Sequence, residues 1–390
     1  MLNVNKTLFY LAFVGFPLSA SLTILLSLPM SYMSILFKFI VAFVGSFFIL
    51  RSILSFRGKV NFYVFMFLCF WVFYFIRIFY DTIIVDDMEL GRPGWFYWVW
   101  GLLVCFVPSL SIIVSKKLDV ESLSLSILFF IVSLIILLIG KTTWPDSSGM
   151  EQEISRLNLT TLNPISAGHV GASLALLSIL RLVSMRGNFL NIKSAYDLIA
   201  LTIGLAVMLL AVSLGAIVSF VVSAGIFILF YFRFRVFFFS SLFFSGCLFL
   251  LFNVHEELFY RLFDIGSRSS VIGRVEMYNS AIQGFLDSPI FGLSLEEPIH
   301  KFSVHNIFLE SLMAIGLFSM PLFIVAFRAI YLSIRLIREK SKFTLIAVLF
   351  FQYLVGSLFS GGVVTNYPFW ILLGALLFIS SKHGKPYYER

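Results

Sequence analysis

Long apolar stretches, separated by short polar ones, run through almost the whole chain. An apolar stretch of about 17–25 residues can cross the ~30 Å hydrocarbon core of a bilayer as a helix. The first stretch is longer than the roughly 7–15 apolar residues of a cleavable signal segment, so we expect it to be retained. The pattern predicts twelve spans, near residues 8–28, 34–50, 60–80, 95–114, 122–140, 164–182, 195–211, 214–232, 236–253, 305–330, 343–360 and 367–380.

The composition agrees with a membrane protein. Of the 390 residues, 60% are hydrophobic and only 12% are charged, which excludes a soluble domain. The cysteines lie inside apolar stretches, so they indicate neither a disulfide framework nor a metal site; they are Cys69, Cys105 and Cys247. The predicted fold class is therefore an all-α polytopic membrane protein with about twelve transmembrane helices.

The basic residues predict which side of the membrane each connection faces. With a cytoplasmic N-terminus, the inner connections hold 19 of the 28 Lys and Arg residues, as the positive-inside rule requires. Both termini are then cytoplasmic, and the net charge of +8 reflects topology rather than nucleic-acid binding.

Three regions follow from this topology. Residues 1–253 hold spans one to nine with the external loops 81–94 and 141–163. Residues 254–304 form a large periplasmic loop between spans nine and ten, and residues 305–390 hold spans ten to twelve and a cytoplasmic tail. The long connections are all external, so we expect the function to lie on that side.

The large loop contains a helical pattern. Apolar residues recur at Val275, Tyr278, Ile282 and Phe285, with polar residues between them, which predicts an amphipathic helix over 273–286 lying on the outer surface of the bundle. Ser269 or Ser270 can cap its start, and Ser288-Pro289 ends it. A shorter pattern over 258–263 predicts a second such helix.

Two arginines accompany the predicted amphipathic helix. Arg268 precedes it and Arg274 lies in its first turn, where guanidinium groups and a helix N-terminus together can bind a phosphate or diphosphate. The alternative is that the arginines hold lipid headgroup phosphates or pair with Asp264 and Glu276.

Polar residues also stand where span ten begins. His305 is predicted to share a helix face with Gly316, whereas Glu310 falls beneath Asn306 at the i,i+4 spacing. A neutral imidazole beside a wet cavity can take a proton from a sugar hydroxyl. The alternative is that His305 and Asn306 are helix caps and that Glu310 is protonated or extends to the interface.

The other external loops hold weaker candidates. Arg156 can supply a further anion contact, with a solvated loop arginine as the alternative. Carboxylates in loop 81–94 can in principle hold a divalent ion, but a single acidic cluster without spaced partners favours a solvated loop; its members are Asp86, Asp87 and Glu89.

The segments GRVEMYNSAI, DSPIFG and VHNIFLESLMAIG, in that order at the end of a long external loop, resemble the O-antigen polymerase and ligase superfamily. The last span, NYPFWILLGALLF, is similar too. Within this resemblance Arg274, Gly292 and His305 match the arginine, glycine and histidine of the family's block, and Arg156 resembles its second arginine. One departure is Ser213-Leu214-Gly215, where many members have Ser-Arg-Gly.

The resemblance implies a metal-independent, inverting membrane glycosyltransferase of the C type that needs no cofactor. It would act on undecaprenyl-diphosphate-linked oligosaccharides at the periplasmic face of the bacterial inner membrane, with membrane lipids and a chain-length regulator as further candidate partners. The implied catalytic residues are His305 and Arg274. The expected substrate-binding residues are Arg156, Arg268, Asn306, His300 and Gly292, and no metal ligands are expected.

Four functions remain open. A polymerase of O-antigen or related repeat units is favoured over an O-antigen ligase, because only the eight residues 293–300 separate Gly292 from Lys301, whereas ligases usually carry a longer, more basic connection. A secondary transporter is disfavoured because the chain shows no repeat of two six-span halves. A non-catalytic scaffold would not need arginines and a histidine on one external surface.

Overall fold

The computed structural model describes residues 4–28, 30–55, 61–85, 90–143, 156–159, 162–185, 192–232 and 269–382. This part of the chain is helical, as predicted, apart from one antiparallel pair of three-residue strands, β1 (Lys141–Thr143) and β2 (Arg156–Asn158). The α-helices are α1 (Val4–Leu25), α2 (Met30–Ser55), α3 (Phe62–Phe79), α4 (Gly94–Trp98), α5 (Val107–Ile113), α6 (Ser122–Ile139), α7 (Pro164–Ser184), α8 (Ile192–Leu210), α9 (Leu214–Tyr231), α12 (Ser269–Asp287), α13 (Ile307–Ile315), α14 (Met320–Arg338), α15 (Thr344–Gly356) and α16 (Tyr367–Lys382). Shorter π and 3-10 turns continue three of them; these are η1 (Tyr80–Ile84), η2 (Val99–Phe106) and η3 (Gly316–Ser319).

The helices confirm a multi-pass membrane protein. Within the described residues, nine helical segments are long and apolar enough to cross a bilayer, and they coincide with predicted spans one to eight and ten. The shorter apolar helices α15 and α16 coincide with spans eleven and twelve. The predicted span at 236–253 lies outside the described residues.

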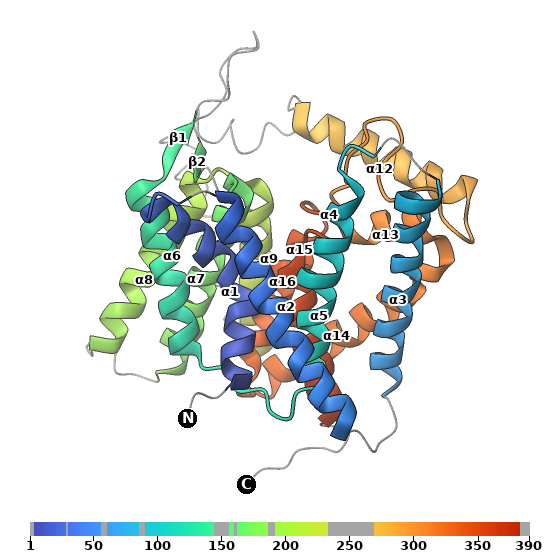
Figure 1. Cartoon of the computed structure of the whole chain (residues 1–390). Helices are drawn as coiled ribbons and strands as arrows, with labels where there is room; N and C mark the ends of the chain where they lie inside the picture. The colour runs from blue at the N-terminus through green and yellow to red at the C-terminus, as the bar shows by residue number, and fades with distance from the viewer. Residues whose placement is uncertain are drawn as a thin grey trace.

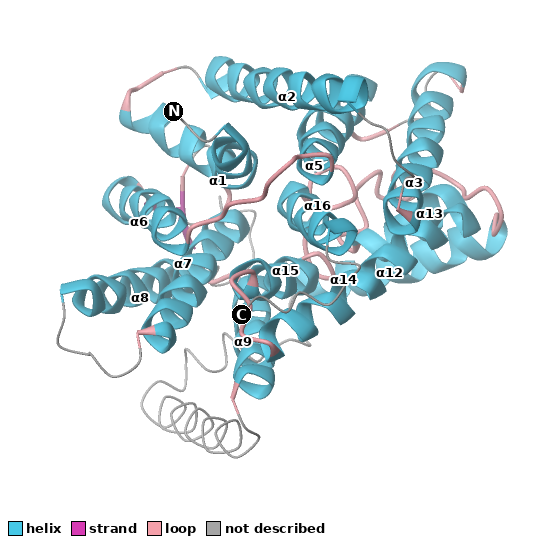
Figure 2. Ribbon diagram, turned by 90° about the horizontal axis from the view of Figure 1, so that it is seen from below, coloured by secondary structure: helices cyan, strands magenta, loops and turns pink. Residues whose placement is uncertain are grey.

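The centre of the bundle is formed by α15 and α16, with the other helices around them (Figure 2). Every residue of α16 from Tyr367 to Ser380 is buried. Its Trp370 packs against Trp71 of α3, with 4.7 Å between ring centroids. Helices at the periphery, such as α2, expose large apolar side chains instead, for example Phe43 at 77%. Such exposure suits a lipid environment.

Helices α7 and α8 pack unusually closely. A Cβ atom on Gly204 would lie 2.7 Å from the carbonyl oxygen of Gly171 and 2.8 Å from the amide nitrogen of Ala175. Only glycine therefore allows the two backbones to approach this far, which is how small residues favour packing between membrane helices. Nearby, Arg181 and Asp197 form a buried ion pair, with 2.7 Å between Nε and Oδ1.

The predicted amphipathic helix is present as α12, which lies with β1 and β2 at one end of the bundle (Figure 1). It ends just before Ser288-Pro289, as expected, but it begins at Ser269, four residues before the predicted start. Ser269 and Ser270 therefore lie inside the helix and not at its cap. The apolar face predicted to lie on the bundle was wrong in part, because two of its residues, Val275 and Ile282, are 53% and 45% exposed. The helix is rotated so that Ala281 and Gly284 face the bundle, since these small residues let α12 approach α13 closely. The shorter helix predicted at 258–263 lies outside the described residues.

The start of span ten differs from the prediction. Helix α13 begins at Ile307, so His305 precedes it and does not share a helix face with Gly316. The helix also stops at Gly316, whose φ of 58° breaks it before η3 and α14 continue. At this break the amide of Leu317 donates to the carbonyl of Pro289 (2.8 Å), so the external loop inserts where the helix is interrupted.

The glycine packing can be tested with two alanine substitutions of opposite expected sign. Gly204→Ala should destabilise the protein by about 1–3 kcal/mol, because the new Cβ meets rigid backbone of α7. Gly273→Ala is the matched control: its Cβ would meet no atom within 4 Å, and better helix propensity should stabilise by about 0.5–1 kcal/mol. Thermal unfolding in detergent measures both, and an unchanged midpoint for Gly204→Ala would contradict the packing argument.

Candidate functional site

A cavity of about 880 Å³ opens beside the loop that precedes α13. Five segments that are far apart in the sequence form its wall. They are the middle of α1, the segment from Arg92 into η2, the start of α7, the loop 302–305, and the turn between α15 and α16. Its polar lining residues include Arg92, Asn163, His169, Ser303, His305 and Asn366. Aromatic rings line much of the remainder, as in a site that receives sugar rings; they include Phe96, Trp100, Phe302, Tyr353 and Tyr367.

His305 lies on the wall of this cavity in a strained conformation. Its φ is 60°, in the left-handed region that a residue with a Cβ rarely adopts. Such strain costs of order 1–3 kcal/mol and persists where the surrounding structure enforces it. The next residue, Asn306, caps α13 by accepting hydrogen bonds from the amides of Phe308 and Leu309, at 3.1 and 3.2 Å. The cap thus fixes the backbone that carries the imidazole.

The imidazole of His305 is neutral near pH 7. Burial, and to a smaller extent the positive charges of Arg274 and Arg92, together lower its pKa from the ordinary value to about 4. Its Nδ1 is buried and has no hydrogen-bond partner among the described residues. The Phe302 ring packs beside it, with 5.3 Å between ring centroids. The neutral imidazole of His305 can therefore accept a proton from a bound hydroxyl.

Arg274 reaches this neighbourhood from α12. It does not line the cavity itself, but its charge acts on both His305 and Tyr278, one helical turn further along α12. The Tyr278 hydroxyl donates to the carbonyl of Leu358 (2.7 Å) and also interacts with the Asn306 side chain. These contacts fix α12 to the chain near His305, so the charge of Arg274 acts on the imidazole. The catalytic roles expected of Arg274 and His305 stay predictions.

Glu310 has a structural role, with partners other than the one we expected. Its Oε2 accepts a hydrogen bond from Ser303 Oγ (2.6 Å), and its Oε1 accepts one from the amide of Val363 (2.7 Å). The side chain therefore joins the loop before α13 to the turn before α16 and does not stack on Asn306. A Cβ on Gly362 would collide with the carboxylate, so glycine is required there.

His300 lies outside the cavity. Its ring nitrogen Nδ1 is 2.8 Å from the carboxylate of Glu297, and its side chain is 46% exposed. Burial raises the pKa of Glu297, but hydrogen bonds from Ser280, from the amides of His300 and Ile299 and from the His300 ring outweigh burial, and the net pKa is lowered. Glu297 thus holds the turn before His305 and links it to α12.

Gly292 shapes the loop without lining the cavity. Its φ is 75°, and a Cβ there would collide with the backbone of Ala314 and Ile315. Its carbonyl accepts a hydrogen bond from Arg77 (3.3 Å), which also donates to the carbonyl of Leu293. Position 292 therefore needs glycine because the loop presses against the end of α13.

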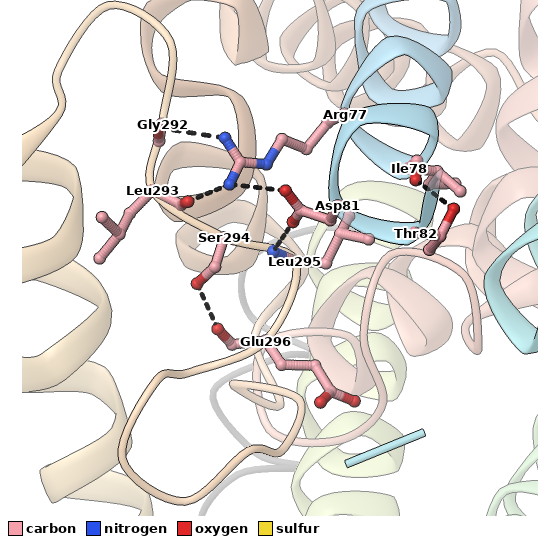
Figure 3. A network of polar contacts seen from close by, with 9 residues as sticks. All are labelled: Arg77, Ile78, Asp81, Thr82, Gly292, Leu293, Ser294, Leu295 and Glu296. Atoms are coloured by element: carbon pink, nitrogen blue, oxygen red, sulfur yellow. Dashed lines mark hydrogen bonds and ion pairs between the residues drawn. The ribbon is translucent and has the colours of Figure 1, made fainter. Parts of the chain in front are cut away.

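A buried ion pair anchors this loop to α3 (Figure 3). Arg77 Nη2 lies 2.9 Å from Asp81 Oδ1, and the two side chains are only 9% and 0% exposed. Asp81 Oδ2 accepts a hydrogen bond from the amide of Leu295 (2.9 Å). The two charges thus pair with each other, and the pair binds three backbone groups of the loop, at residues 292, 293 and 295.

Several expected site residues remain untested. Arg268 and the acidic residues of loop 81–94 at 86, 87 and 89 lie outside the described residues. The backbone of Arg156 pairs with Thr143 between β2 and β1, but its side chain is outside the described part. Ser213 caps α9 by accepting a hydrogen bond from the amide of Ala216 (3.4 Å), and Leu214 follows where the resembling family has arginine. No group of three or more potential metal ligands occurs among the described residues.

Sequence reasoning missed Arg92 and the polar residues at the starts of α7 and α16. No motif in the sequence singles out Arg92, yet it lines the cavity and its charge acts on His305. A usable signal was present: Arg92-Pro93-Gly94 directly precedes a membrane helix. Nothing in the local pattern, however, relates residue 92 to residue 305.

The anchoring pair can be tested by a double-mutant cycle. Asp81→Leu should destabilise the protein by about 3–5 kcal/mol, because it leaves the buried Arg77 charge without its partner. Adding Arg77→Leu removes that charge, so the double variant should be less destabilised than the sum of the single ones. Thermal and chemical unfolding of the four proteins measures the coupling; simple additivity would contradict the ion pair as anchor.

Comparison with known proteins gives one match. The model of the O-Antigen ligase family matches residues 199–324, about a third of the chain, from α8 through α12 and α13 into the start of α14. No curated protein and no solved structure matches. The matched stretch contains Arg274, Gly292, His305 and Asn306, the residues on which the resemblance rested. The match over residues 199–324 therefore supports the resemblance of this multi-pass membrane protein to the O-antigen polymerase and ligase superfamily.

Proposed function

We propose that the chain is a polymerase that joins undecaprenyl-diphosphate-linked repeat units of O-antigen, or of a related surface polysaccharide, at the periplasmic face of the bacterial inner membrane. The observation that carries the proposal is His305: a neutral imidazole, in a strained backbone conformation, on the wall of a cavity with aromatic lining and with Arg274 close by.

The proposed reaction is an inverting glycosyl transfer without a metal. His305 takes the proton of an acceptor hydroxyl as its oxygen attacks C1 of the donor sugar. The bond between C1 and the diphosphate oxygen breaks, and the diphosphate leaves with the electron pair. Arg274 stabilises the negative charge that grows on the leaving group, with Arg268 and Arg156 as further cations at the diphosphate.

The remaining expected binding residues act around the histidine. Asn306 fixes its backbone by capping α13, and Gly292 allows the loop to press against the end of that helix. His300 closes the turn through Glu297 and is proposed to meet the glycan outside the cavity. Both lipid anchors stay in the bilayer, so donor and acceptor would enter laterally between helices.

An O-antigen ligase is the alternative, with lipid A core as acceptor. The compact connection between Gly292 and Lys301 favours the polymerase, because Glu296 and Glu297 hold it tightly and leave no separate basic segment. Deleting the gene in its native strain and examining the lipopolysaccharide on a gel separates the two. One repeat unit on the core means polymerase; bare core with free lipid-linked polymer means ligase.

Replacing the base gives a direct test. His305→Ala should lower the rate of polymer formation by about 10²–10⁴-fold, the usual contribution of a general base. His300→Ala is the comparator, with an expected loss of no more than about tenfold, because its ring lies outside the cavity. Complementation of the deletion strain and a polymerisation assay with purified protein measure both. Long polymer from a strain carrying His305→Ala would refute the role of the histidine.

The pH profile gives a second test. Because the pKa of His305 is lowered to about 4, the imidazole stays deprotonated well below the ordinary histidine pKa of about 6.5. The rate should therefore hold from pH 8 down to about 5 and fall as the pH approaches 4. Arg274→Gln removes one positive charge, raises the pKa of His305 and moves this fall to higher pH. A wild-type rate that halves near pH 6.5 would contradict the assignment.

A further inference from the structure

Arg92 is a cation on the cavity wall without an ion-pair partner among the described residues. Its guanidinium carbon lies 4.7 Å from the centroid of the Phe96 ring and 5.2 Å from that of the Phe302 ring. The rings orient the group by cation–π contact and leave its N–H donors free. Since Phe302 also packs on His305, the guanidinium and the imidazole contact the same aromatic ring.

The backbone on both sides of Arg92 is fixed to the loop that carries His305. Glu296 Oε2 accepts a hydrogen bond from the amide of Gly91 (2.5 Å), and its Oε1 accepts one from the Tyr97 hydroxyl. A Cβ on Gly91 would collide with the carbonyl of Lys301, so the two segments touch directly. The contacts of Gly91 and Tyr97 therefore fix the backbone of Arg92 beside the loop that carries His305.

The carboxylates near Arg92 are engaged elsewhere. Glu296 is satisfied by Gly91 and Tyr97, and Glu310 by Ser303 and Val363. None of the described residues that line the cavity is acidic. The free guanidinium therefore faces a space without a described counter-ion.

Two helix N-termini add to the positive potential. The cavity is lined by the first residues of α7 and by those of α16, so the positive ends of both helix dipoles point toward it. His169, in the second turn of α7, is 8% exposed and lines the same space, and its Nδ1 has no hydrogen-bond partner among the described residues. A buried polar group without a partner at this place indicates a polar ligand.

We infer that Arg92 is a further diphosphate-binding arginine of this site, which acts together with Arg274 beside His305; the inference rests on the proposed function. A diphosphate offers two phosphate groups, and a guanidinium can bind each of them through two parallel hydrogen bonds. Arg274 above the loop and Arg92 on the cavity wall would hold the donor with its C1 beside the imidazole.

The test measures lipid binding to the purified protein in detergent, with undecaprenyl diphosphate and undecaprenyl monophosphate as the two probes. Wild type should bind the diphosphate more tightly, and Arg92→Gln should reduce that preference by about tenfold or more, since a charge-assisted contact is lost. Arg92→Lys should keep part of it, because lysine retains the charge but not the paired donors. Arg338→Gln is the matched control: its guanidinium lies 5.2 Å from the Phe230 ring at the far end of α14, and its loss should change nothing.

The outcomes separate the inference from the proposed function. If Arg92→Gln keeps the wild-type preference for undecaprenyl diphosphate over the monophosphate, the inference is overturned. The proposed polymerase function is then still tested separately by His305→Ala. A wild type without any preference for the diphosphate overturns the inference and counts against the proposed donor as well. Equal competition by phosphatidylglycerol would identify a lipid headgroup as the ligand and also overturn it. If Arg92→Gln unfolds, the comparison of Arg92→Lys with wild type decides.

Discussion

The buried ion pair between Arg77 and Asp81 is the contact on which the half of the structure around the cavity depends. Charges in a membrane helix are costly unless they are paired and hydrogen-bonded, and this pair has both kinds of contact. Arg77 donates to the carbonyls of residues 292 and 293, and Asp81 accepts from the amide of residue 295. From that anchor the loop runs through Glu296 and Glu297 to Asn306, and each of these side chains fixes a further turn. Several buried polar contacts, the first of which involve a membrane helix, thus together fix the position of His305.

The polar groups of this region fall into two kinds. The acidic side chains at 81, 296, 297 and 310 each accept hydrogen bonds from the protein itself, and they hold segments together. The basic and imidazole groups at 92, 169 and 305 lack such partners among the described residues and line one cavity. Fully satisfied networks give rigidity, whereas unsatisfied groups around a space are suited to binding a ligand. The same separation explains why an acid inside the membrane, Glu310, serves the fold rather than the chemistry.

Two non-glycine residues with a strained backbone lie where the chemistry is proposed. His305 and Lys301 both have positive φ in the short loop before α13, and Gly292 and Gly316 have it where the loop meets the end of that helix. A continuous helix through residue 305 would have avoided this cost. The capped start at Ile307 instead leaves His305 on an irregular backbone that faces the cavity. Irregular backbone at a membrane surface is tolerated where it lines a polar space, and this loop meets that condition.

Hydropathy and charge alone determined the class, the positions of eleven of the twelve predicted spans and the presence of the amphipathic helix, because helix length and the positive-inside bias are properties of local sequence. The quoted motifs also identified Arg274, Gly292 and His305 as candidate site residues, because all three lie within one stretch of the chain. Only the tertiary structure decided that His305 precedes its helix, that Glu310 bonds to Ser303 and Val363, and that α12 turns Ala281 rather than Ile282 toward the bundle. It alone brought Arg92 to His305, across more than two hundred residues. Periodicity reports which residues share a face of one helix, but contacts between distant segments depend on how backbones pack, and that packing is set by glycines, buried charges and caps acting together.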